Sequence, residues 1–264
     1  MNLLSIIIVN YNTPELVYDC LRSIERFLPP DFYEVLIVEN ASPNAVVTAE
    51  KVAGFAKAHL IAATHNHGFG SGNNLGAKAA QGDLLWLLNS DTLLVDDSII
   101  ALCQSLRSSE QYGALLPLLY RNQALTDFQE DSYASFQTLT GLIKRTPRPQ
   151  LNLNQEIADV EVAVAAAFVV KRAVFEAVGG FDETFFMFFE DDDLCKKIIN
   201  SGKKIGIFTK SRIVHLQGKS ITTSKERKKL YYQSQNYYWK KHHGLALSLV
   251  MQVLRLPYRL ITRK

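Results

Sequence analysis

The sequence predicts an α/β domain with a mostly parallel central sheet and helices on both faces. Short apolar runs suited to buried strands alternate with segments of helical periodicity over residues 4–95. Strands that alternate with helices pair in parallel within one sheet. The 264 residues are 47% hydrophobic, which is enough to bury a full core. We therefore expect one large domain, or one domain with a small appendage.

The first part of the chain is expected to alternate strictly. The predicted strands are Leu4–Val9, Glu34–Val38, Leu60–Ala63 and Leu84–Asn89. The first predicted helix begins at Pro14 and runs through Ile24, and the second follows the turn Glu39–Asn44 and runs to about His59. Gly68–Gly72 is predicted to be a loop, and Asn73–Gln81 a third helix.

The second part is less regular. Residues 121–158 have a mixed polar composition with a basic proline stretch, Lys144–Pro149, and are predicted to be a mobile excursion rather than a core element. Order returns with Val160–Val170, a helix at Arg172–Val178 and a strand at Lys204–Phe208.

Four polar turns follow the predicted strands. They are Asn10-Tyr11, Glu39-Asn40, the loop near Gly68, and Ser90-Asp91. Ligands of such sheets bind beyond the carboxyl ends of the strands, so these turns should line one rim. Asp91 follows a buried strand directly and is well placed to hold Mg²⁺ or Mn²⁺, although an isolated Asp after a strand is more often an ordinary turn residue.

An acidic run provides the stronger signal. Glu190 to Asp193 follow the aromatic segment Phe185–Phe189 and begin a predicted helix. Acids at a helix start interact favourably with the helix dipole, which accounts for one or two of them. An apolar wall raises the pKa of a neighbouring carboxyl group toward that of a useful base. His215, with Lys210, Arg212 and Lys219 around it, suits a nearby phosphate.

Charge is segregated along the chain. Residues 1–202 carry a balance of −11, and residues 203–264 carry +14 with Glu226 as their single acid. The basic tail includes a helix with Ser248, Gln252, Arg255 and Arg259 on one face and leucines elsewhere, which predicts either peripheral binding to an anionic membrane or packing on the domain. Three widely spaced cysteines and an opening without signal-peptide features favour a cytoplasmic protein, peripheral on the inner face of the plasma membrane.

Seven stretches together resemble the inverting family-two glycosyltransferases of the GT-A fold, in particular bacterial rhamnosyltransferases. They occur in the family's order: Ser5–Asn12, Val38–Ser42, Asn66–Asn74, Leu87–Asp91, Gly179–Glu183, Phe186–Cys195 and Val214–Ser220. The resemblance implies a GT-A domain over residues 1–222, with a nucleotide-sugar-binding half (1–95) and an acceptor half (96–222). A basic helical extension (223–264) follows.

The resemblance also implies roles for the matched residues. Contacts to the nucleotide sugar are expected from Asn10, Tyr11, Glu39, Asn66, Gly68, Gly72, Asn73, Asn74, Ser90 and Asp91. Asp91 would hold the metal with His215 as a second ligand, and Asp191 would be the catalytic base with Glu190 as the next candidate. Glu39 stands where the family usually has Asp, and Ser90 where it often has Pro.

The expected function is inverting transfer of a sugar, with L-rhamnose from dTDP-rhamnose as the best candidate. The acceptor would be a hydroxyl of a glycan or of a polyprenyl-diphosphate-linked glycan in cell-surface polysaccharide synthesis. A sugar-phosphate nucleotidyltransferase is an alternative, although it needs a glycine-rich phosphate loop and residues 10–14 contain no glycine. A catalytically silent nucleotide-sugar-binding module remains open. Nucleic-acid binding is disfavoured, because the acidic first part of the chain would repel phosphate.

Overall fold

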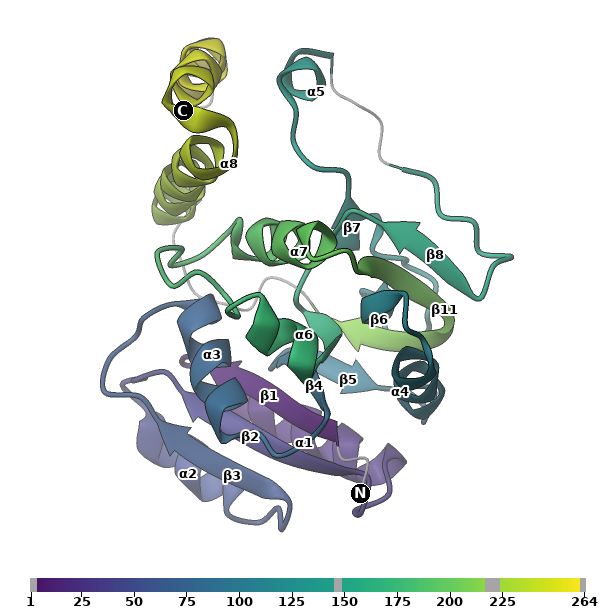
Figure 1. Ribbon diagram of the computed structural model, residues 1–264. Helices are drawn as coiled ribbons and strands as arrows, with labels where there is room; N and C mark the ends of the chain where they lie inside the picture. The colour runs from purple at the N-terminus through teal and green to yellow at the C-terminus, as the bar shows by residue number, and fades with distance from the viewer. Residues whose placement is uncertain (1–3, 145–148, 217–223, 262–264) are drawn as a thin grey trace.

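The computed structural model describes residues 4–144, 149–216 and 224–261. Its centre is a sheet between two helical layers (Figure 1). One face is covered by α1 (Pro14–Phe27), α2 (Ala45–Val52) and α4 (Ile99–Ser108), and the other by α3 (Phe69–Ala79), α6 (Arg172–Ala177) and α7 (Glu190–Asn200). The predicted fold class, with helices on both faces, is confirmed.

The main sheet has nine strands in the order β3-β2-β1-β4-β10-β6-β11-β5, with β8 also paired to β11. Its strands are β1 (Leu4–Asn10), β2 (Tyr33–Glu39), β3 (Ala58–Ala62), β4 (Leu84–Asn89), β5 (Thr92–Leu94), β6 (Tyr112–Tyr120), β8 (Ile157–Val160), β10 (Ala167–Lys171) and β11 (Lys204–His215). The strands β3, β2, β1 and β4 are all parallel, whereas β10 runs antiparallel to both of its neighbours. The carboxyl ends of β1, β2 and β4 therefore meet at one rim.

Alternation along the strands explains the two helical layers, because successive side chains point to opposite faces of a sheet. Ile6 and Ile8 pack in the cluster that contains Leu21 of α1 and Leu102 of α4. Ile7, between them, packs in the cluster on the opposite face with residues of α3, α6 and α7. All of these β1 side chains are fully buried.

Three predicted boundaries in the first part are wrong. The second predicted helix, expected to run to about His59, ends at Val52, and His59 lies in β3. Gly68–Gly72 is not a loop, because α3 begins at Phe69, and β3 begins at Ala58, two residues before the predicted Leu60. Glycine is a poor helix former, but close packing overrides that preference here. A Cβ added at Gly72 would lie 2.8 Å from a methyl group of Val9, and one at Gly76 would lie 2.5 Å from Ile7. The glycines let α3 lie directly on β1.

The prediction that residues 121–158 are an excursion outside the core is also wrong for part of that segment. Gln129, Ser132 and Tyr133 are buried, and the backbone N–H of Gln129 donates to Leu119 O at 2.8 Å. A short 3-10 turn (Glu130–Ser132) leads into β7 (Tyr133–Ala134), which pairs with β9 (Val162–Ala163). The segment then reaches α5 (Leu139–Lys144), and the residues 145–148 of the basic proline stretch lie outside the described residues.

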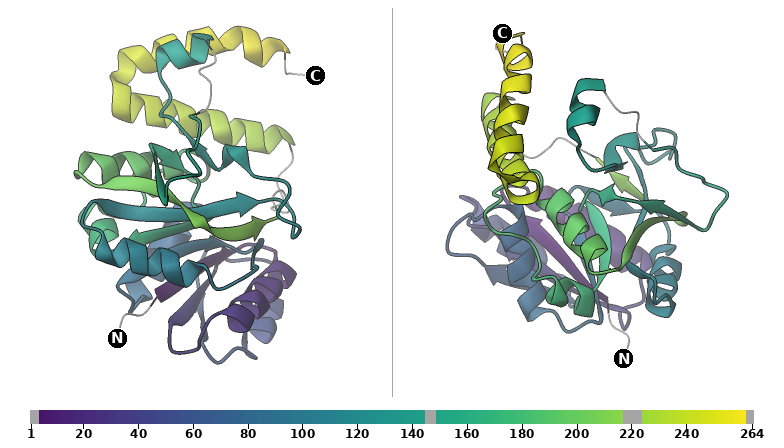
Figure 2. Two further views of the ribbon diagram at one scale, coloured as in Figure 1. Left: turned by 90° about the vertical axis from the view of Figure 1, so that its right-hand side faces the viewer. Right: turned by 45° about the horizontal axis from the view of Figure 1, so that its top comes forward.

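The predicted C-terminal helix is present as α8 (Ser224–Ile261), but it is a hairpin of two arms rather than one rod (Figure 2). Gly244, with φ 83°, separates a first arm (residues 224–243) from a second arm (residues 245–261). Tyr238 and Trp239 of the first arm pack with Phe185 and Phe189. The predicted boundary at residue 222 lies outside the described residues. None of the described helices is long and apolar enough to cross a membrane.

Candidate active site

The turn after β1 and the turn after β2 are joined by buried hydrogen bonds. The side-chain amide of Asn10 donates to Glu39 at 2.6 Å and to Thr48 at 3.0 Å, and its oxygen accepts from the Thr13 hydroxyl at 2.8 Å. The second oxygen of Glu39 accepts the backbone N–H of Ser42 at 2.9 Å. Asn10 and Glu39 are almost fully buried. The pair therefore braces the rim, and the contact to a nucleotide base and ribose stays a prediction.

Tyr11 and Ser90 belong to the turns that follow β1 and β4. The Tyr11 ring is 42% exposed and can stack on a planar group. The hydroxyl of Ser90 lies 3.0 Å from that of Thr13, which links the turn after β4 to the turn after β1. These contacts bring the first and last predicted polar turns together.

A third turn connects the rim to the aromatic segment. Asn66 accepts hydrogen bonds from the Asn40 amide and from the backbone N–H of Gly68, both at 2.9 Å. Gly68 has φ 93°, and a Cβ there would overlap the carbonyl group of Phe186. Only glycine fits this backbone and this close approach. Asn40, which the sequence does not mark as a ligand contact, thus holds the loop in place.

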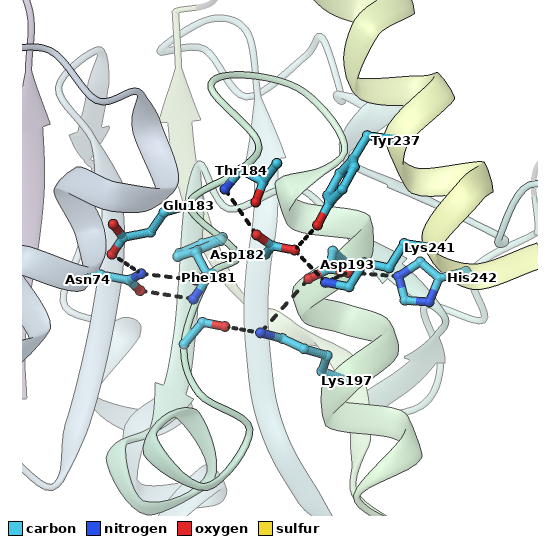
Figure 3. Close-up of polar contacts among 11 residues, drawn as sticks. Asn74, Phe181, Asp182, Glu183, Thr184, Asp193, Lys197, Tyr237, Lys241 and His242 are labelled. Atoms are coloured by element: carbon cyan, nitrogen blue, oxygen red, sulfur yellow. Dashed lines mark hydrogen bonds and ion pairs between the residues drawn. The ribbon is translucent and has the colours of Figure 1, made fainter. Parts of the chain in front are cut away.

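Three residues of α3 that were predicted to contact the nucleotide sugar instead make contacts within the protein. Gly72 packs on Val9, and the Asn73 amide donates back to Phe69 O at 3.0 Å. Asn74 donates to Phe181 O at 3.0 Å and to Glu183 at 2.9 Å (Figure 3). Their direct contact with a donor sugar stays a prediction. Asn74 ties α3 to the loop that leads to the acidic run.

Asp91 and His215 lie together at the end of β4 and of β11. The nearest oxygen of Asp91 is 3.3 Å from Nε2 of His215, and both residues are 7% exposed. Nδ1 of His215 lies 2.9 Å from the Gln129 side-chain oxygen, so this contact orients the ring with Nε2 toward Asp91. An imidazole nitrogen and a carboxylate oxygen that face each other are both suitable ligands of a cation. Lys210 is instead paired with Glu156 at 2.9 Å, and Lys219 lies outside the described residues.

The start of α7 is strained and buried. Phe188 and Phe189 adopt φ values of 70° and 65°, a left-handed conformation that bulky residues rarely take. Their rings pack against Tyr231 of α8, which holds the unusual backbone in place. Glu190 follows immediately and is 5% exposed. Within the described part of the chain, one carboxylate oxygen each of Glu190 and Asp191 is buried without a hydrogen-bond partner.

Burial sets the acidity of these groups. Desolvation raises the pKa of Asp191 to about 7, and the charge of Asp192 adds to this, against the opposing backbone N–H of Ala165. Desolvation also raises the pKa of Asp192 to about 6 and that of Glu190 well above its usual range. A carboxyl group with a pKa near neutrality can both accept and release a proton at physiological pH.

The acidic run lies next to the Asp91 region through the backbone that leads into β10. Ala165, whose N–H acts on Asp191, is followed by Ala166, whose carbonyl accepts the backbone N–H of Asn89 at 2.9 Å. The Asn89 side chain lies 3.4 Å from Nε2 of His215. The structure thus brings Asp191 and the Asp91–His215 pair, predicted from distant parts of the sequence, to one rim.

Asp193 has a different role from its neighbours. It is fully buried and pairs with Lys241 Nζ and His242 Nε2, both at 2.7 Å (Figure 3). Lys241 also reaches Asp182 at 2.7 Å. Burial raises the pKa of Asp182, but hydrogen bonds from Lys241, Thr184 and Tyr237 outweigh it and hold that pKa below its usual range. Asp193 therefore fastens the first arm of α8 to α7, a role that the sequence could not reveal.

Gln129 is the main residue that sequence reasoning missed. It orients His215 across 86 residues of sequence. It sits in a segment of mixed polar composition, so no local pattern marks it.

Known proteins share sequence features with this chain. The model of the family described as "Glycosyl transferase family 2" matches residues 5–179. The low-salt glycan biosynthesis hexosyltransferase Agl10 of Haloferax volcanii is 25% identical over 209 residues, which cover 77% of this chain and 64% of that protein. Rhamnosyltransferase WbbL of Escherichia coli is 23% identical over 163 residues, which cover 56% of this chain and 61% of WbbL.

A solved structure shows the same fold. The mannosyltransferase PcManGT from Pyrobaculum calidifontis, solved with GDP-Man and Mn²⁺, superposes with a TM-score of 0.65 at 17% identity, covering 90% of this chain and 63% of that one. The GT-A type of fold is thereby confirmed. The chain spans somewhat less than two thirds of the length of the first relatives that it matches.

Proposed function

The chain belongs to glycosyl transferase family 2, and on this premise we propose that it is an inverting, metal-dependent glycosyltransferase. It transfers a sugar from a nucleotide diphosphate donor to a hydroxyl group of an acceptor. One observation carries the proposal: Asp191, with a pKa raised to about 7 and a buried oxygen left without a partner among the described residues, lies at the same rim as Asp91 and His215.

Asp191 is the base of the proposed reaction. Its carboxylate accepts the proton of the acceptor hydroxyl while the hydroxyl oxygen forms a bond to the anomeric carbon. The bond from that carbon to the diphosphate oxygen breaks, and the diphosphate leaves with the electron pair. Attack opposite the leaving group inverts the configuration. Glu190 is the next candidate; its carboxyl group is also buried, and desolvation raises its pKa well above the usual range.

The residues at Asp91 fit a divalent cation. A carboxylate oxygen and an imidazole nitrogen face each other at 3.3 Å, and oxygen and nitrogen ligands suit Mg²⁺ or Mn²⁺. Among the described residues no group of three or more His, Cys, Asp or Glu side chains forms a complete metal site. Donor diphosphate oxygens would therefore complete the shell. Such a cation would offset the negative charge that develops on the leaving diphosphate.

The donor and acceptor are proposed more finely from the relatives. We infer L-rhamnose from dTDP-rhamnose as the donor, supported by the 23% identity to rhamnosyltransferase WbbL. A hydroxyl of a glycan, or of a glycan linked to a polyprenyl diphosphate, is the proposed acceptor in cell-surface polysaccharide synthesis. The support for this is the similarity to Agl10, which is named for glycan biosynthesis.

A screen of nucleotide sugars tests the proposal. The protein is incubated with each donor plus Mn²⁺ or Mg²⁺, and mass spectrometry follows release of the nucleoside diphosphate. We expect turnover of dTDP-rhamnose above other donors, and its loss in EDTA. Turnover of a different donor would reject rhamnose but keep the transferase. Tight donor binding without turnover, with every acceptor class supplied, would favour a binding module. Formation of a nucleotide sugar from a sugar phosphate and a nucleoside triphosphate would favour a nucleotidyltransferase.

A further inference from the structure

The second arm of α8 exposes most of its large apolar side chains, whereas a helix that packs on a soluble domain usually buries them. Its large apolar side chains point outward and are 40–62% exposed: Leu245, Leu247, Leu249, Val250, Val253 and Leu254. Figure 2 shows this arm as the outermost layer of the molecule, separated from the sheet by the first arm. Monomeric soluble proteins rarely leave a contiguous apolar surface of this kind uncovered.

The inward face of the same arm carries one apolar anchor, Met251, which is 1% exposed and packs with Tyr238 and Trp239 of the first arm. The other inward contacts are polar. The Ser248 hydroxyl is 2% exposed and donates to Asn236 O of the first arm at 3.2 Å. Arg255 donates to Gln235 at 2.6 Å and to Asn236 at 2.9 Å, and its guanidinium lies 4.4 Å from the centre of the Tyr232 ring. These contacts fix the side of the second arm that faces the first arm. The side that carries the exposed leucines and valines therefore faces solvent.

The polar stripe predicted for the tail has its partners on the first arm. Ser248 and Arg255 both bond to it, so the leucine-rich side of the second arm is turned away from the domain. Binding of that side to a membrane interface stays a prediction. The side chain of Arg259 lies outside the described residues. A packed helix normally turns its apolar face inward to remove it from water. Here the apolar face is left for an external partner.

Charge selects the partner. The first arm has exposed basic side chains at both ends, namely Lys225, Arg227, Lys228, Lys229 and Lys240, and Glu226 is the single acid in residues 203–264. A second copy docked symmetrically would place the same patch against itself and bring like charges together. An anionic lipid surface has the opposite charge and an apolar interior, and it therefore complements both features.

We propose that the α8 hairpin docks on anionic membranes, with Leu249 and Val253 at the centre of the inserted face. The arm lies in the plane of the interface, because no described helix can cross a bilayer. The first arm packs through Tyr231 and Tyr238 on Phe189, directly before Glu190. A docked hairpin thus holds the start of α7 one helical layer from the lipid. The inference rests on the hairpin alone and does not depend on the transfer reaction.

Vesicle sedimentation tests the proposal with the full-length protein. We expect binding to phosphatidylcholine vesicles that contain about one third phosphatidylglycerol, and weaker binding to pure phosphatidylcholine. The double variant Leu249→Glu/Val253→Glu should lower partitioning by about tenfold or more, because it puts charge into the inserted face. Val46→Glu is the matched control, since Val46 is 72% exposed on α2, and it should bind like the parent.

Salt and oligomeric state separate the proposal from its rivals. Added salt should weaken binding only in part, because the apolar contact is not screened. Complete loss of binding in salt would reject apolar insertion. A parent protein that ignores anionic vesicles and is dimeric by light scattering, with the double variant monomeric, would assign the face to a second copy. If the double variant unfolds by circular dichroism, the single Val253→Glu, at a 62% exposed position, replaces it in the same test.

Discussion

Two buried polar regions can be compared: the turns after β1 and β2, and the start of α7. In the first region the polar groups are hydrogen-bonded, whereas in the second some carboxylate oxygens are not. Around Asn10 and Glu39, the side-chain oxygens and nitrogens are bonded to one another and to nearby backbone at 2.6–3.2 Å. At Glu190 and Asp191, carboxylate oxygens are buried without partners in the described part of the chain, and the backbone before them is strained.

The contrast separates a region built for rigidity from one that is a candidate for chemistry. Buried polar groups that are fully paired stabilise one geometry and rigidify it. Buried carboxylates left unpaired cost stability, and such a cost is typically found where chemistry requires it. We therefore expect substitutions at the first region to change stability and those at the second to change turnover.

The largest expected effect is at Asp191. Asp191→Asn should lower turnover about 10²–10⁴-fold, because the amide cannot accept the acceptor proton, while donor affinity stays within a few-fold. Turnover and donor binding are measured separately, by product release and calorimetry. Asp192→Asn makes the same charge change one residue along and should cost much less. Near-normal turnover of Asp191→Asn would move the base to Glu190 or Asp192.

The next effect is expected at Gln129. Gln129→Ala removes the group that orients His215, and changes of this kind typically weaken metal affinity about 10–100-fold. Turnover is measured against Mn²⁺ concentration, and excess metal should restore most of it. Gln123→Ala, at an exposed position in the same segment, is the control. An unchanged metal requirement would mean that His215 is not a ligand.

A smaller, graded effect is expected with pH. The carboxylate form of Asp191 is the active one and its pKa is raised to about 7, so the transfer rate should fall about tenfold per pH unit below that value. Stability has the opposite sign. The folded state keeps a proton that the unfolded chain releases above the ordinary pKa of 3.8, so unfolding free energy should fall as pH rises from about 4 to about 7. Asp191→Asn should flatten the rate profile and make the stability slope shallower, with the remaining slope due to Glu190 and Asp192, whose pKa values are also raised. A stability slope identical to that of the parent would show that the retained proton is not on Asp191.

The smallest effect on turnover is expected at Asn10. Asn10→Ala removes one buried hydrogen-bond partner each from Glu39 and Thr13 and should cost about 1–3 kcal/mol of unfolding free energy, with little change in the pH profile. Chemical denaturation measures the loss. Asn200→Ala, at the exposed end of α7, should be nearly neutral. A loss of turnover as large as that of Asp191→Asn, with unchanged stability, would reverse the assignment of the two regions.

The sequence alone was sufficient for the architecture of the first part of the chain. Buried runs such as Leu84–Asn89 and helices such as the one starting at Pro14 depend on local hydrophobic periodicity, which is visible in any short window. The polar turns at the rim followed from the same reasoning, because the carboxyl ends of parallel strands converge. Asp91 and Asp191 are also visible locally, since one directly follows a buried strand and the other lies in an acidic run behind five aromatic and apolar residues.

Contacts between distant segments decided the rest. A glycine is found at position 72 within a helix, because Val9 leaves no room there for a larger residue. Gln129 belongs to the candidate site because it contacts His215, which is 86 residues away in the sequence. The facing of the α8 hairpin depended on the pairing of Arg255 with Gln235 across the turn at Gly244. An amphipathic pattern shows that a helix has two faces, but only its packing partner determines which face is turned inward.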